Sequence, residues 1–131
     1  MSIVGESRLG LLTGIRVLLV EDHADTRDIL YQVLAHEGAL VTAAASAREA
    51  IPTIPLVDIV VTDVAMPGES GVWLSGQVMQ SPRRVPIIAV TGFADQADVA
   101  TAPFARVLRK PVDPWRLCTE IRDVLGQREP E

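Results

Sequence analysis

The sequence predicts an α/β domain in which helices cover both faces of a parallel sheet. Five short apolar runs alternate with segments of helical spacing along the 131 residues. The runs are rich in branched side chains, which suit strands that are buried on both faces. Strict alternation of strands and helices favours a parallel sheet with right-handed crossovers. We therefore expect a doubly wound sheet of five strands and five helices.

The chain begins its alternation with a strand over residues 15–20. Apolar pairs that start at Ile29 and recur four residues later then give a first helix one buried face. Gly38 is the residue type that commonly follows a helix end. A second strand is expected over residues 40–44.

A capping pattern predicts the next helix. Ser46 and Glu49 have the three-residue spacing of a capping box, and Pro52 should end or distort the helix within about two turns. A third strand follows over residues 58–62. Beyond a turn-rich loop, residues 72–80 have helical spacing again.

The last third of the chain contains two more strands and two more helices. A fourth strand covers residues 86–90, and residues 95–102 have room for about two helical turns before Pro103 interrupts them. The fifth strand covers residues 105–109. Proline is favoured in the first turn of a helix, so the last helix is expected over Pro114–Leu125.

Length and charge restrict the class of protein. A chain of 131 residues, 48% of them hydrophobic, forms one domain with a real core. Its formal net charge of −5 argues against non-specific binding to nucleic acid or to an anionic membrane. The apolar runs are too short to cross a bilayer, and the first residues do not resemble a signal peptide. We therefore expect a cytoplasmic protein.

The chain divides into three parts by composition. Residues 1–14, with scattered glycines and leucines, are expected to form a leader or linker that packs on the domain or frays. Residues 15–127 form the domain, and residues 128–131 a frayed tail. The single cysteine, Cys118, cannot form an intrachain disulfide and is interpreted as a packing residue.

Polar side chains stand where four of the predicted strands end. They are Glu21, Asp22, Asp63, Thr91 and Lys110. Ligands of open α/β sheets bind outside the carboxyl ends of the strands, so these residues can converge. Three acids placed close together raise one another's pKa values unless a cation neutralises them. Oxygen ligands of this kind suit Mg²⁺, so the sequence predicts a magnesium site.

Four motifs at these positions resemble the receiver domain of two-component response regulators. They are Val17-Leu-Leu-Val-Glu-Asp22, Asp63-Val-Ala-Met-Pro-Gly68, Val90-Thr-Gly92 and Lys110-Pro111. The similarity covers about residues 15–127. It implies a flavodoxin-like sheet with strand order 2-1-3-4-5, which places four strand ends around one cleft.

The resemblance also implies the role of each residue. Asp63 is the expected phosphoacceptor, and Thr91 and Lys110 complete the cage around the phosphoryl group. The expected inner ligands of Mg²⁺ are Asp22, Asp63 and the carbonyl of Ala65, whereas Glu21 binds directly or through water. The chain would catalyse only its own phosphorylation and dephosphorylation, and its partner would be a sensor histidine kinase or a histidine phosphotransfer domain. The downstream target and a homodimer are left open.

Several alternatives remain in view. The chain is either a stand-alone receiver or the excised receiver of a hybrid histidine kinase, and less favoured is a receiver that binds proteins without phosphorylation. A flavodoxin-type electron carrier would need an anion cradle after the first strand, where Glu21 and Asp22 would repel a flavin phosphate. A haloacid-dehalogenase-type phosphatase would carry a second aspartate at the position of Ala65.

Three departures from the family pattern concern signalling. Val107 occupies the position at which many receivers have a switching aromatic ring. The segment between Thr91 and Lys110 is shorter than usual, so its helix must be short or displaced. Ala65 and Phe93 flank the expected path of the attacking water and cannot orient it, which predicts slow hydrolysis.

His23 and His36 are expected to be exposed and without partners.

Overall fold

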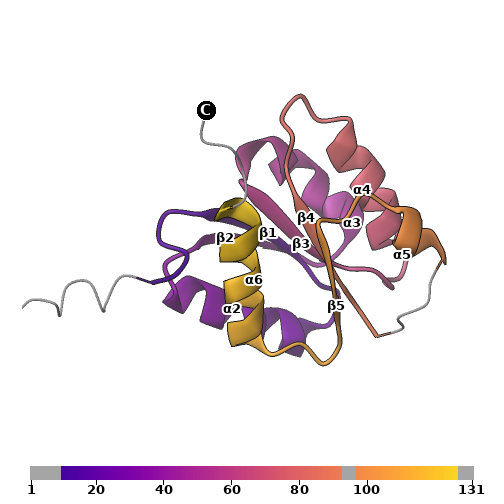
Figure 1. The fold of residues 1–131 in the computed structure, drawn as a ribbon. Helices are drawn as coiled ribbons and strands as arrows, with labels where there is room; N and C mark the ends of the chain where they lie inside the picture. Colours follow the sequence, from indigo (N-terminus) through magenta and orange to yellow (C-terminus); the bar gives the residue numbers. More distant parts are fainter. Residues whose placement is uncertain (1–9, 93–96, 127–131) are drawn as a thin grey trace, which may run out of the picture.

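A five-stranded parallel sheet forms the centre of the structure, a computed structural model that describes residues 10–92 and 97–126 (Figure 1). The strands are β1 Arg16–Val20, β2 Leu40–Ala44, β3 Ile59–Asp63, β4 Ile87–Thr91 and β5 Arg106–Arg109. Their order, β2-β1-β3-β4-β5, confirms the predicted order. Four of the five strands begin one residue later than predicted. β3 and β4 also end one residue later than predicted, so Asp63 and Thr91 are the last residues of their strands.

The helices of the described residues lie on both faces of the sheet, as predicted (Figure 1). They are α2 Ala24–His36, α3 Ala47–Ala50, the 3-10 helix η1 Ile51–Leu56, α4 Gly71–Met79, α5 Ala97–Thr101 and α6 Pro114–Gly126. Helices α2 and α6 cover one face, and α3, η1 and α4 cover the other. The pairing follows from the crossovers, because strands on either side of β1 are reached over opposite faces.

The two faces of the sheet bury two separate apolar clusters. In β1, Val17 and Leu19 point into the cluster beneath α2 and α6, whereas Leu18 and Val20 point into the cluster beneath α3 and α4. Successive side chains of a strand alternate between faces, so an unbroken run of branched residues fills both clusters. Cys118, on α6, is completely buried in the first cluster, and burial raises the pKa of its thiol to about 11.

Local signals in the sequence account for the helix ends. Gly38 has φ of 96° just after α2, a conformation that glycine adopts without strain. The Ser46 hydroxyl accepts a hydrogen bond from the Glu49 amide, at 3.1 Å. The predicted effect of Pro52 is confirmed as a distortion, because the α-helix α3 ends at Ala50 and the chain continues as the 3-10 helix η1. The predicted short helix before Pro103 is confirmed as the five-residue α5.

The segment before β1 packs against the domain where the structure describes it. Leu12 is completely buried, and its amide donates to the carbonyl of Glu37 at 2.9 Å. Arg122, on α6, donates to the carbonyl of Leu11 at 3.1 Å. A side chain at Gly10 would collide with the backbone of Glu37. Residues 10–14 thus hold the end of α2 and the side of α6 together.

None of the described helices is both long and apolar enough to cross a membrane.

The burial of Leu12 yields a stability prediction. We expect Leu12→Ala to lower the free energy of unfolding by about 2–5 kcal/mol, because it leaves a cavity in place of a fully buried side chain. The neighbouring Leu11, 38% exposed, provides the matched control, and Leu11→Ala should cost less than about 1 kcal/mol. Urea unfolding of both variants measures the two free energies. A loss for Leu12→Ala as small as that for Leu11→Ala would show that the segment does not contribute to the core.

Candidate functional site

The predicted site residues gather at the carboxyl edge of the sheet. Asp63 ends β3 and Thr91 ends β4, while Glu21 directly follows β1 and Lys110 directly follows β5. The strand registers pair Asp63 with Val90, so the ends of these strands are level. A parallel sheet carries all its carboxyl ends at one edge, which explains how residues distant in sequence meet.

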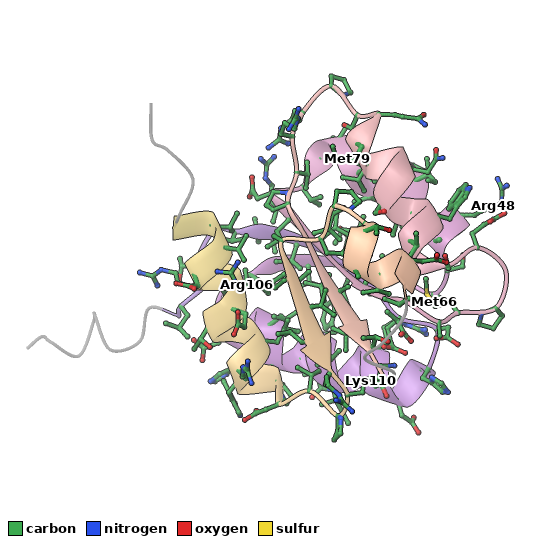
Figure 2. The ribbon with its side chains drawn as sticks, turned by 45° about the vertical axis from the view of Figure 1, so that its right-hand side comes forward. Arg48, Met66, Met79, Arg106 and Lys110 are labelled. Atoms are coloured by element: carbon green, nitrogen blue, oxygen red, sulfur yellow. The ribbon has the colours of Figure 1, made fainter. Side chains whose placement is uncertain are left out.

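Lys110 joins two of the acids. Its Nζ lies 2.9 Å from Oδ2 of Asp63 and 3.6 Å from Oε1 of Glu21. The Lys110 amide donates to the Thr91 carbonyl at 2.9 Å, which continues the pairing of β4 with β5 beyond the strand end. The Lys110–Pro111 peptide bond is cis. Figure 2 shows Lys110 at the opposite end of β5 from Arg106, which pairs with α6.

Burial and neighbouring charges shift the pKa values of Glu21 and Lys110. Burial raises the pKa of Glu21, and the negative charge of Asp63 adds to this rise, although the His23 amide and Lys110 oppose it. Burial alone would lower the pKa of Lys110, but its hydrogen bond to Asp63 and the charges of Asp63 and Glu21 raise the pKa above its ordinary value. The ammonium form of Lys110 is therefore secure at neutral pH.

The acidic pair after β1 lies at the start of α2. Arg27 donates to the Glu21 carbonyl at 2.9 Å, and the His23 amide donates to Glu21 Oε2 at 3.1 Å. Oδ1 of Asp22 is buried and has no hydrogen-bond partner among the described residues. An unpaired buried carboxylate oxygen is costly in free energy, so it indicates a position for a cation.

The expectation that His23 lacks partners is wrong. Its side chain is exposed, as expected, but its ring nitrogen Nδ1 lies 3.5 Å from Glu21 Oε2. Ligand atoms of Glu21, Asp22 and His23 lie within 4.8 Å of one another and could share a metal ion. Sequence periodicity missed this because His23 precedes the helix as its N-cap residue. His36, the last residue of α2, packs edge-on against the ring of Trp115.

The loop after β3 is held close to the strand end. A side chain at Gly71 would collide with the carbonyl of Asp63, so only glycine lets α4 start this close to the strand. The Thr62 hydroxyl also donates to the Asp63 carbonyl, at 2.9 Å. Ser70 caps α4 by accepting from the Trp73 amide at 3.1 Å, a cap that the sequence analysis missed.

The remaining predicted residues differ in how they are placed. Thr91 is buried at the end of β4, whereas the side chain of Ala65 is exposed in the loop after β3. Phe93, expected to flank the path of the attacking water, lies outside the described residues. Val107, in β5, is 43% exposed. The described residues thus bring Glu21, Asp63 and Lys110 into direct contact, with Asp22 beside them.

A cavity partly lined by apolar side chains lies next to the cluster of Glu21, Asp63 and Lys110. It has a volume of ≈ 510 Å³ and lies between α2 and the connection from β5 to α6. Glu21 and Lys110 line it, together with the apolar side chains of Ile29 and Val112. Ile29 is 56% exposed, so the surface around this cavity combines apolar contact with access to the charged cluster.

Comparisons with known proteins agree with one family. The model of the response regulator receiver domain matches residues 17–122. A 14.6 kDa protein from the sodA1 3′ region of Leptolyngbya boryana is 42% identical over 77% of this chain and 82% of its own length. The phosphoglycerate transport system transcriptional regulatory protein PgtA of Salmonella typhimurium is 34% identical over 86% of this chain. The match spans only 28% of PgtA.

Solved structures show the same fold. A CheY-like receiver domain protein from Methanospirillum hungatei has a TM-score of 0.80 at 27% identity, over 86% of this chain and 94% of its own. TrrA from Thermotoga maritima, solved in complex with Mg²⁺ and BeF, has a TM-score of 0.75 at 24% identity, over 84% and 98%. Together with the family match over most of the chain, these likenesses show that this protein belongs to the response regulator receiver domain family of two-component signalling.

Proposed function

We propose that this receiver domain accepts a phosphoryl group onto Asp63 in a reaction that requires Mg²⁺. The contact of Lys110 Nζ with Asp63 Oδ2, at 2.9 Å, carries the proposal, because it places a fixed positive charge on a buried carboxylate at the sheet edge. The donor would be a phosphohistidine of a sensor kinase or of a phosphotransfer domain. The Mg²⁺–BeF complex of TrrA supports the choice of cation by analogy.

The reaction joins Asp63 to phosphorus. A carboxylate oxygen of Asp63 forms the new O–P bond while the donor's N–P bond breaks, and the bonding electrons return to the donor imidazole, which takes up a proton. The product is an acyl phosphate. Little covalent work is left to the protein, so positioning and charge neutralisation supply the catalysis.

Lys110 supplies the positive charge on one side of the phosphoryl group. Its ammonium already contacts Asp63 and need move little to meet a phosphoryl oxygen. The Thr91 hydroxyl would donate a hydrogen bond to another oxygen from the end of β4. Bound Mg²⁺ would neutralise further negative charge, and Asp22, Asp63, the carbonyl of Ala65 and Glu21 would hold it.

The donor would approach over the apolar surface beside the site. Ile29 is exposed on α2, next to the cavity that Glu21 and Lys110 line. A partner that buries Ile29 would bring its histidine close to Asp63 and exclude water from the transfer.

Asp63 is expected to be the single site of phosphorylation. Incubation with acetyl phosphate and Mg²⁺ should add one phosphoryl group by intact mass, labile to hydroxylamine, and Asp63→Asn should abolish it. Asp58 precedes the same strand and pairs with Arg16 at 2.9 Å, away from the site, so Asp58→Asn should still be labelled. Labelling of Asp63→Asn at the parent's level would remove Asp63 from this role.

Lys110 and Thr91 should differ in how much they contribute. Thr91→Ala removes one hydrogen bond to a charged group, worth about 1.5–3 kcal/mol, or roughly 10- to 160-fold in rate. Lys110→Ala removes a full charge and leaves Asp63 without its 2.9 Å partner, so it should lower the rate of phosphorylation further than Thr91→Ala does. Initial rates of phosphorylation measure both. Equal and negligible losses would mean that the cage is formed by other residues.

The acyl phosphate is expected to hydrolyse slowly, because Ala65 cannot orient an attacking water. The side chain of Ala65 is exposed, so Ala65→Asn should be tolerated by the fold and should speed hydrolysis by offering a hydrogen-bonding amide. Timed loss of the phosphorylated mass in parent and variant checks this. Rapid decay of the parent, or no change in the variant, would contradict it.

A further inference from the structure

Arg48, on α3, bridges two side chains at the start of α4. Its Nη2 lies 3.3 Å from Oε2 of Glu69, and its Cζ lies 5.1 Å from the centre of the Trp73 ring. A flat guanidinium can stack on an aromatic ring and still donate hydrogen bonds to a carboxylate at its edge. Arg48 therefore ties α3 to one residue just before α4 and to one residue in its first turn.

The first residue of α4 is in turn bound to the end of β3. The Gly71 amide donates to the Val64 carbonyl at 2.9 Å, and a side chain at Gly71 would collide with the carbonyl of Asp63. The Val64 amide donates to the Val90 carbonyl at 3.1 Å, which fixes this point to β4. Contacts therefore run from the surface at Arg48 to the backbone beside the expected phosphoacceptor.

Helix α3 also holds the loop between β3 and α4, residues 64–70, from the inside. Met66 is only 9% exposed and packs in the same apolar cluster as two alanines of α3. Figure 2 shows Arg48 at the surface of the molecule and Met66 inward of it. Ala65 thus lies between two fixed neighbours, Val64 and Met66, in a loop that α3 holds on both sides.

We propose that Arg48 is a positioning residue, which raises the Mg²⁺ affinity of the site by keeping the Ala65 carbonyl in place. The inference rests on the metal site of the proposed function and adds to it a residue that does not touch the ion. Mg²⁺ demands near-ideal octahedral geometry, so a carbonyl ligand on a loosely held loop costs affinity even when every ligand is present. Residues that orient metal ligands commonly affect metal affinity for this reason.

The charge of Arg48 by itself predicts the opposite effect. Its removal makes the surroundings of the site more negative, which strengthens the attraction of a divalent cation. If Arg48 acts by holding the loop, its removal weakens Mg²⁺ binding. The sign of the change in affinity therefore separates positioning from long-range electrostatics.

Calorimetric titration with Mg²⁺ tests the inference without a phosphoryl donor. Glutamine retains good helix propensity but removes the guanidinium, so Arg48→Gln should leave α3 formed. We expect this variant to bind Mg²⁺ about three- to tenfold more weakly than the parent, a modest loss because the Arg48 side chain is 73% exposed. Unchanged or stronger binding would reject Arg48 as a positioning residue.

Arg16→Gln is the matched control for this titration. Arg16 begins β1 and pairs with Asp58 at 2.9 Å, at the opposite edge of the sheet from the site. The substitution removes the same charge from the same kind of arginine–carboxylate pair. Its Mg²⁺ affinity should stay close to that of the parent, and a loss equal to that of Arg48→Gln would also reject the positioning role.

Two further measurements distinguish positioning from a general loss of stability. Arg48→Lys restores a charge opposite Glu69 but not the flat guanidinium over Trp73, so it should recover part of the lost affinity. In the metal-free protein, Arg48→Gln should speed amide exchange at Gly71, because its bond to Val64 opens more often, and should leave exchange in β1 unchanged. Equally faster exchange in both places would mean that the variant only destabilises the fold.

Labelling by acetyl phosphate in the same preparations keeps the two proposals apart. A parent that labels, with unchanged Mg²⁺ affinity in Arg48→Gln, refutes the positioning role and leaves the proposed function standing. A parent that does not label, but whose Mg²⁺ binding is weakened by Arg48→Gln, refutes the proposed function and keeps the positioning role. A parent that binds no Mg²⁺ refutes both.

Discussion

The ion pair of Lys110 with Asp63 is the contact around which the carboxyl edge of the sheet is arranged. It spans from β3 to β5, across the intervening β4, and brings the lysine within 3.6 Å of Glu21 as well. Without a cation at this point, the acids of the edge would repel one another in a poorly solvated place. The same pair holds the Lys110 ammonium against the buried Asp63 side chain at the carboxyl edge of the sheet.

The rest of the fold serves to keep this edge in register. Two apolar clusters fix the sheet from both faces, and the level pairing of Asp63 with Val90 and of Thr91 with Arg109 sets the height of the strand ends. The close approach of Gly71 to Asp63 keeps the loop between β3 and α4 at the same edge. A site built on strand ends is therefore as rigid as the sheet, while the neighbouring loops remain available for partners.

Much of this arrangement could be predicted from the sequence, because apolar periodicity reports burial directly. The alternation of strands and helices was visible, but their order in the sheet came only with the family resemblance. Strand ends shifted by a residue because backbone pairing, which periodicity does not record, extends β3 to Asp63 and β4 to Thr91. The packing of Leu12 depends on a tertiary contact with Glu37, which no local pattern predicts. The contact of His23 with Glu21, two residues away, depends on the backbone conformation between β1 and α2, which apolar periodicity does not record.

The buried thiol of Cys118 makes the opening of α6 observable. Only a thiolate reacts readily with alkylating reagents, and a pKa of about 11 together with complete burial keeps Cys118 almost entirely unreactive in the closed state. Modification must therefore wait until α6 leaves the sheet. Since Cys118 is the chain's single cysteine, its rate of alkylation measures how often α6 detaches from the sheet, and no probe has to be introduced.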